Sequence, residues 1–201
     1  MDWEVAIKMA IMRFDTQQFQ ESISTNKHMK ELIPTLKEIN RLGLLTIESQ
    51  PGKHVNYKHF LTNEDVEYSE KAFIAGFMQE ELAEKFIQYF NINTDKFAMA
   101  ITIAGNEVDM SVKLDFPMRI IKNKFQCTTE VHKHMSTSVP IDWFMVKRSH
   151  LFISPRENLV YLYCFDNKWN RLGNAEDGLF TDVLNALTFI DNILKKNKNN
   201  V

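Results

Sequence analysis

The fold is decided by residues 28–52, which read HMKELIPTLKEINRLGLLTIESQPG. In the first part of this stretch, apolar residues recur at helical spacing and predict an amphipathic helix with one apolar stripe. The stripe consists of Leu32, Ile33, Leu36, Ile39 and Leu42. Because proline is tolerated in the first turn of a helix but not in its interior, Pro34 predicts that the regular helix begins near Ile33. Gly43 follows the last apolar position, where helices commonly end on a left-handed residue.

The second part of the stretch predicts a short strand followed by a tight turn. The segment 44–47 is mainly apolar, which is typical of a strand buried on both faces. Pro51 fixes φ at the first central position of a turn and Gly52 supplies positive φ at the second, so residues 49–52 fit a type II turn. In open α/β sheets ligands bind at the carboxyl ends of strands, where this turn would lie.

The turn supports two interpretations. In the first, it is a site for a small polar ligand, where the Gly52 N–H approaches the ligand and Arg41 or Lys71 supplies positive charge. The candidate ligand-binding residues are Arg41, Thr46, Ser49, Gln50, Gly52 and Lys71. In the second, which the sequence favours, it is an ordinary turn with solvated polar residues, because analogy between folds does not establish a site. The polar segment 53–65 likewise reads as a lid over the turn or as a surface loop.

Length and composition bound the class of protein. A chain of 201 residues with 44% hydrophobic residues suits a single domain, residues 1–201, with a sizeable core. The net charge of −2 and the pI of about 6.3 indicate no broad basic surface, so nucleic-acid binding is not expected. The two cysteines do not support a disulfide scaffold, and neither a signal peptide nor a membrane span is predicted. These features favour a soluble, cytoplasmic protein.

The remaining periodicities predict an α+β fold, with one mixed, mostly antiparallel sheet of about five to seven strands and helices packed on it. The expected helices are 2–14, 79–90 and 178–195, the expected strand is 66–77, and the expected hairpins are 96–116 and 150–165. The helix–strand unit at 33–48 is a candidate for a parallel neighbour in the sheet. The Lys/Asn-rich segment 195–201 is predicted to be a disordered tail.

The central stretch also carries a resemblance. The pattern Asn40-Arg41-x-Gly43-x-x-Thr46-x-x-Ser49-Gln50-Pro51-Gly52, followed by the strand segment 72–77, resembles an uncharacterised domain-of-unknown-function family of actinobacterial and viral proteins. The family pattern has Gln-Arg before that strand, where this chain has Glu70-Lys71. The resemblance covers about residues 30–78 and implies no particular reaction. It does imply that the turn and the strand at 67–77 lie side by side.

Few residue patterns carry chemistry. The sequence contains no glycine-rich phosphate loop, no Gly-x-Ser-x-Gly elbow, no Cys-x-x-Cys pair and no His-Glu-x-x-His motif. His132 and His134 would share one face of a strand, but a zinc site needs three or four ligands, so no metal site is predicted. We therefore predict no cofactor, assign no catalytic residue and leave open whether the protein is an enzyme.

The lack of a catalytic constellation favours a non-enzymatic interaction or accessory protein, of which a viral accessory protein is one form. Its partner would be another protein or a second copy of the chain, and exposed aromatic side chains would make the contact. The alternative is a small-ligand-binding protein or enzyme with its site at Ser49-Gln50-Pro51-Gly52.

Overall fold

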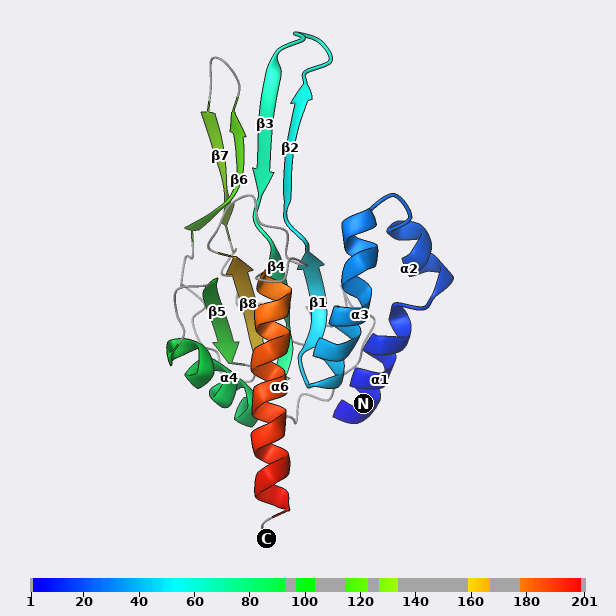
Figure 1. Cartoon of the computed structure of the whole chain (residues 1–201), viewed down its shortest axis with the longest axis vertical. Coiled ribbons are helices and arrows are strands. Elements are labelled where there is room, and N and C mark those ends of the chain that lie inside the picture. The colour runs from blue at the N-terminus through cyan, green and yellow to red at the C-terminus, as the bar shows by residue number, and fades with distance from the viewer. Residues whose placement is uncertain are drawn as a thin grey trace.

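Figure 1 shows a computed structural model of the chain, which describes residues 2–92, 97–103, 115–122, 127–133, 159–166 and 178–199. The helices in this part of the chain are α1 (Trp3–Arg13), α2 (Gln17–Ser22), α3 (Lys27–Arg41), α4 (Glu80–Ile92) and α6 (Leu179–Lys198). The strands are β1 (Leu45–Gln50), β2 (Lys53–Lys58), β3 (Asp65–Glu70), β4 (Phe73–Gln79), β5 (Phe97–Ile103), β6 (Asp115–Lys122), β7 (Cys127–Lys133) and β8 (Leu159–Asp166). The predicted α+β class is therefore confirmed.

The described strands form two four-stranded sheets, which we call the body sheet (order β1-β4-β8-β5) and the arm sheet (order β2-β3-β6-β7). Every pairing within them is antiparallel. The prediction of one mixed sheet of five to seven strands is therefore wrong, and β1 is an antiparallel rather than a parallel neighbour of β4. In Figure 1 the helices cover the body sheet, while β2 and β3 project above it.

A long hairpin joins the two sheets. Its outgoing leg is β1 followed by β2, and its returning leg is β3 followed by β4. Residues 51–52 and 71–72 are unpaired between the two sheets, and we call these four residues the joint. Gly52 has a positive φ of 77°, as predicted, but the chain does not reverse there. The predicted type II turn is instead a joint, because both flanking strands pair with the same returning leg. The expected proximity of this segment to the strand at 67–77 is confirmed, since Gln50 pairs with Phe73.

The polar segment 53–65 forms most of the projecting hairpin β2–β3, which we call the arm. Residues 53–58 are the strand β2, and only the short tip that follows is irregular. Both interpretations of this segment are wrong. It is not a surface loop, because residues 53–58 pair with β3, and it is not a lid, because the arm in Figure 1 points away from the joint. Strand pairing with β3 decided this outcome, and the polar residues are tolerated because the side chains of β2 are mostly exposed.

The hydrophobic core lies between the body sheet and the helices α3, α4 and α6 (Figure 1). The fully or nearly fully buried apolar side chains of α3 and α6 follow their apolar stripes, which confirms the helical periodicity. They are Leu32, Leu36 and Ile39 in α3 and Leu179, Phe180, Val183, Ala186, Leu187 and Ile190 in α6. Helix α6 continues to Lys198, so residues 195–198 of the predicted disordered tail are helical.

The other predicted elements have mixed outcomes. The expected helices 2–14 and 79–90 correspond to α1 and α4. Of the expected hairpin 96–116, the first strand is β5, which pairs with β8 in the body sheet. Its turn lies outside the described residues, as does the first strand of the expected hairpin 150–165.

Helix α3 begins earlier than its proline suggests. It starts at Lys27, and the side chain of Asn26 caps it by accepting a hydrogen bond from the Met29 N–H at 3.0 Å. Pro34 therefore lies inside the helix, and the prediction of a start near Ile33 is wrong. The helix persists through Pro34 because its apolar face packs in the core, while Pro34 itself is exposed.

We expect Pro34→Ala to raise the free energy of unfolding by about 1–3 kcal/mol, because alanine restores a helical N–H donor and removes the ring's clash with the preceding turn. Thermal unfolding would show this as a rise of about 2–4 °C for each kcal/mol in a chain of this size. The exposed Lys30→Ala, on the same helix, is the control and should change little. A lower melting temperature for Pro34→Ala would mean that the packing of α3 depends on the proline.

Hydrogen bonds between Asn40 and Thr46, which we call the lock, join the end of α3 to the start of β1. The helix closes in a Schellman motif, in which Gly43 (φ 102°) donates to the Asn40 carbonyl and Leu44 donates to the Ile39 carbonyl. The fully buried Asn40 side chain donates to the Thr46 hydroxyl at 2.7 Å, and its oxygen accepts from the Thr46 N–H at 3.0 Å. These bonds set the direction in which β1 leaves the helix.

Candidate functional site

The residues predicted to bind a ligand are distributed along β1 and the joint. Thr46 is 2% exposed, and its side chain is held in the lock with Asn40. Ser49 lines a pocket, and Gln50 is the last residue of β1. Gly52 lies in the joint itself. Thr46 therefore has a structural role, whereas Ser49 is available to a ligand.

The two predicted positive charges lie at different places. Lys71 is buried in the joint, where desolvation lowers the pKa of its amine and the carboxylate of Asp166 acts in the opposite direction. Arg41 ends α3 and pairs with Glu38, with 2.7 Å between Nε and Oε2. The strand β1, about 16 Å long at 3.3 Å per residue, lies between Arg41 and Gln50. The six residues thus do not all converge on one site, and ligand binding by them stays a prediction.

A pocket of about 380 Å³ opens between the N-terminal helices and the body sheet. Its walls come from the end of α1, from α2 and α3, and from β1 and β4. The lining residues are Arg13, Phe14, Phe19, Met29, Ile47, Glu48, Ser49 and Phe73. The volume lies within the range of small-molecule sites, which are mostly apolar with a few polar groups. This lining has that composition.

A β-bulge shapes the sheet side of this pocket. The pairing of β1 with β4 shifts between Thr46 and Glu48, which leaves Ile47 as the extra residue. A bulge re-aims neighbouring side chains. Three consecutive residues, 47–49, line the pocket here, whereas a regular strand would point the middle one to the opposite face. Opposite the bulge stands Gly76, which pairs with Thr46.

Arg13 is the positively charged group of the pocket. One of its terminal nitrogens donates to the Thr46 carbonyl at 3.2 Å, and its guanidinium lies 5.3 Å from the centre of the Phe14 ring. Its Nε is buried and has no hydrogen-bond partner among the residues that the structure describes. Desolvation lowers the pKa of this guanidinium, yet it stays charged at neutral pH. The pocket therefore contains a partly desolvated cation.

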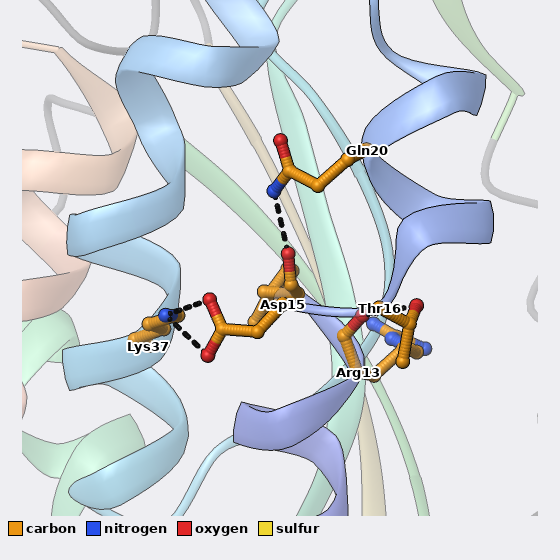
Figure 2. Close-up of polar contacts among 6 residues, drawn as sticks. Arg13, Asp15, Thr16, Gln20 and Lys37 are labelled. Atoms are coloured by element: carbon orange, nitrogen blue, oxygen red, sulfur yellow. Dashed lines mark hydrogen bonds and ion pairs between the residues drawn. The ribbon is translucent and has the colours of Figure 1, made fainter.

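Hydrogen bonds hold the segment that carries Arg13 in place, as Figure 2 shows. The Thr16 hydroxyl donates to the Arg13 carbonyl at 2.8 Å, and the Gln20 amide donates to the Phe14 carbonyl at 2.6 Å. Lys37 of α3 reaches both carboxylate oxygens of Asp15, at 2.6 and 2.8 Å. The connection between α1 and α2 is thereby tied to α3, so Arg13 is presented on a fixed backbone.

A second candidate surface is the tip of the arm, residues 59–64. Phe60 is 87% exposed and Leu61 is 76% exposed, which are the largest values among the exposed large hydrophobic side chains of the described residues. Figure 1 places this tip at the far end of the β2–β3 arm, away from the helices. Large apolar side chains at a projecting end mark interaction sites more often than scattered surface residues do.

The tip is ordered by its own hydrogen bonds. The His59 N–H donates to the Glu64 carbonyl and the Asn63 N–H donates to the His59 carbonyl, both at 2.8 Å. Asn63 adopts a left-handed φ of 53°, which asparagine tolerates, and closes the turn. The rings of His59 and Phe60 stack with 5.3 Å between their centres. The two apolar side chains are thus presented by a defined turn.

Metal and thiol chemistry find little support in the described residues. No group of three or more His, Cys, Asp or Glu side chains there could hold a metal ion. His132 lies in β7, and His134 lies outside the described residues. Cys164 is fully buried, and burial raises the pKa of its thiol to about 12, so it is a core residue and not a nucleophile. No helix of the described part is long and apolar enough to cross a bilayer.

Sequence reasoning named Ser49 of the pocket but missed the other residues of both surfaces. Arg13 is one cation at the end of an ordinary amphipathic helix, and nothing in the local sequence pattern indicates that it lines a pocket together with Ser49. Phe60-Leu61 was visible as an apolar pair within a polar segment, and that signal would have identified the tip if the segment had been read as a hairpin.

The described elements place the protein in the α+β class, with a helix-covered antiparallel sheet that extends one hairpin into a second antiparallel sheet. The chain belongs to the family described as a domain of unknown function (DUF6919), whose model matches residues 13–189. The expected membership of an uncharacterised family is therefore confirmed, over much more of the chain than residues 30–78. Comparison with curated proteins finds no match.

Proposed function

We propose that the protein is a non-enzymatic interaction protein whose docking element is the tip of the arm. The observation that carries this proposal is the exposure of Phe60 and Leu61, at 87% and 76%, on an ordered and projecting turn. Burial of two such side chains in a partner contributes about 3–6 kcal/mol. Because the turn is held by its own hydrogen bonds, little of this free energy is lost in ordering the tip.

The chemistry of the arm favours a folded protein with an apolar pocket as the partner. Asp65 pairs with Lys58 at 3.9 Å and Glu64 adds a further negative charge, so the tip lacks the cluster of basic residues that an anionic membrane surface attracts. Lys53 and Lys58 lie on β2, the outer strand of the arm sheet in the described residues, and lysines on an edge disfavour pairing with a foreign strand. Because these features disfavour a membrane surface and pairing along β2, we infer that the tip inserts end-on into a pocket of the partner.

The test replaces both tip residues, as Phe60→Ser/Leu61→Ser. A photo-crosslinking phenylalanine analogue at position 60 identifies the partner in cells that naturally make the protein, and calorimetry then measures the affinity of the purified pair. We expect the double variant to bind at least about 30-fold more weakly, because a hot-spot residue contributes 2 kcal/mol or more. Its melting temperature should match that of the wild type, since the exposed side chains contribute little to the fold.

Met12→Ser is the matched control, because Met12 is 68% exposed on α1 and lies outside the arm. It should keep full affinity. The proposal fails if the double variant binds as tightly as the wild type, or if Met12→Ser weakens binding equally. If the tip is required for binding to phosphatidylserine vesicles, the partner is a membrane and the proposal of a protein partner is wrong. If the tip is required for dimerisation in sedimentation, the partner is a second copy of the chain.

Ligand binding around the joint remains the second candidate function. It is supported by the placement of Ser49, Gln50, Gly52 and Lys71 on facing legs of the hairpin. A cytoplasmic location and a viral accessory role remain predictions from the sequence.

A further inference from the structure

We propose that the pocket between the N-terminal helices and β1 binds a small amphipathic monocarboxylate, with the carboxylate at Arg13 and Ser49 and the apolar body against the aromatic wall. This function is separate from docking by the tip, because no residue of the tip lines the pocket.

The cation is the first part of the argument. A guanidinium has five N–H groups, and Arg13 uses one hydrogen bond, to the Thr46 carbonyl, in the part of the chain that the structure describes. Burying a charged group is costly unless it is paired. A carboxylate supplies that pairing, and guanidinium and carboxylate match each other in shape. Ser49, which lines the same pocket, offers a hydroxyl as a further donor.

The apolar wall is the second part of the argument. Five of the eight lining residues are apolar, and Phe14 and Phe19 meet edge to face with 5.1 Å between ring centres. Such a wall favours an aromatic or branched aliphatic body of the kind that fills pockets of a few hundred Å³. A fully polar anion would leave this wall in contact with water.

Charge balance selects a monoanion. Arg13 is the one cationic side chain among the lining residues, and Glu48 is the one acidic side chain. A dianion such as phosphate would bring two negative charges into a pocket whose lining has one cation and already carries the carboxylate of Glu48. A single carboxylate brings one negative charge, which Arg13 can compensate, and is repelled less by Glu48.

The experiment titrates ¹⁵N-labelled full-length protein with 3-phenylpropionate, with its neutral amide and with inorganic phosphate. Amide signals of residues in the pocket, including Phe19, Met29 and Ser49, should shift saturably with 3-phenylpropionate. We expect the neutral amide to bind at least 10-fold more weakly and phosphate to bind more weakly still. Arg13→Met should weaken binding of the carboxylate at least 10-fold and leave binding of the amide unchanged.

Lys8→Met on the same helix removes an equal charge outside the pocket and should not change either affinity. If Arg13→Met does not fold, Phe19→Ala provides the second measurement, and it should weaken the carboxylate and the amide to the same extent. The proposal is overturned if 3-phenylpropionate gives no saturable shift at millimolar concentration, if acid and amide bind equally to the wild type, or if phosphate binds more tightly than 3-phenylpropionate.

Discussion

Replacing Gly76 by alanine is expected to lower the free energy of unfolding by more than about 3 kcal/mol, at the upper end for single substitutions. A Cβ at this position would overlap the carbonyl oxygen of Leu45 and would lie 2.8 Å from the Leu45 carbonyl carbon and 2.9 Å from the Thr46 Cα. These are backbone atoms of β1, so no side-chain rotation can relieve the clash. The strand itself would have to move away from β4. Urea unfolding followed by circular dichroism measures the change.

Gly43→Ala is the matched comparison, since it adds the same methyl group at a position where the clash is with a side chain and not with backbone atoms. Gly43 has a φ of 102°, and a Cβ there would lie 2.6 Å from Cδ2 of Leu82, the end of a flexible side chain. The backbone strain costs about 1–2 kcal/mol, and Leu82 can move aside. Gly76→Ala should therefore be the more damaging of the two. If it unfolds within 1 kcal/mol of the wild type, the close approach of β1 to β4 is not as described.

The second large effect is expected for Asn40→Leu, which replaces the lock between α3 and β1 by an apolar side chain of similar size. Asn40 is fully buried, and its amide makes bonds of 2.6 Å to the Leu36 carbonyl and 2.7 Å to the Thr46 hydroxyl. The substitution also leaves the buried Thr46 N–H without its acceptor. An unsatisfied buried donor costs about 1–3 kcal/mol, so we expect a total loss of about 3 kcal/mol.

A double-mutant cycle tests the mechanism of this loss. Thr46→Val removes only the hydroxyl and should cost about 1 kcal/mol, because the bond from the Thr46 N–H to Asn40 remains. The double variant Asn40→Leu/Thr46→Val should cost less than the sum of the two single variants, since both remove the same bond. Additive losses would show that Asn40 and Thr46 stabilise the fold independently.

The same residues show why the family-like pattern was easier to recognise than to interpret. Asn40, Gly43 and Thr46 lie close together in the sequence because they end α3 and start β1, which is a structural role. Among the named positions of the pattern between Asn40 and Gly52, Ser49 is the one that lines the pocket. Motif spacing therefore located the central unit correctly, but it did not separate residues that hold the fold from those that could contact a ligand.

The sequence by itself determined the local elements of this protein. Apolar spacing predicted α1, α3, α4 and α6, and the glycine after α3 predicted its end, because these features depend on contacts a few residues apart. What the sequence could not contain was the division into two sheets, since Pro51-Gly52 reads locally as a reversal of the chain.

Only the tertiary structure decided that Pro51-Gly52 is a joint, that the segment 53–65 projects as an arm, and that Arg13 and Ser49 line the same pocket. Each of these outcomes depends on pairing or packing between distant residues, such as Arg13 with Thr46 across 33 positions. The persistence of α3 through Pro34 has the same origin. Burial of its apolar face in the core outweighs the local penalty of about 3 kcal/mol for a proline inside a helix. A local sequence pattern shows this penalty but not the burial that compensates it.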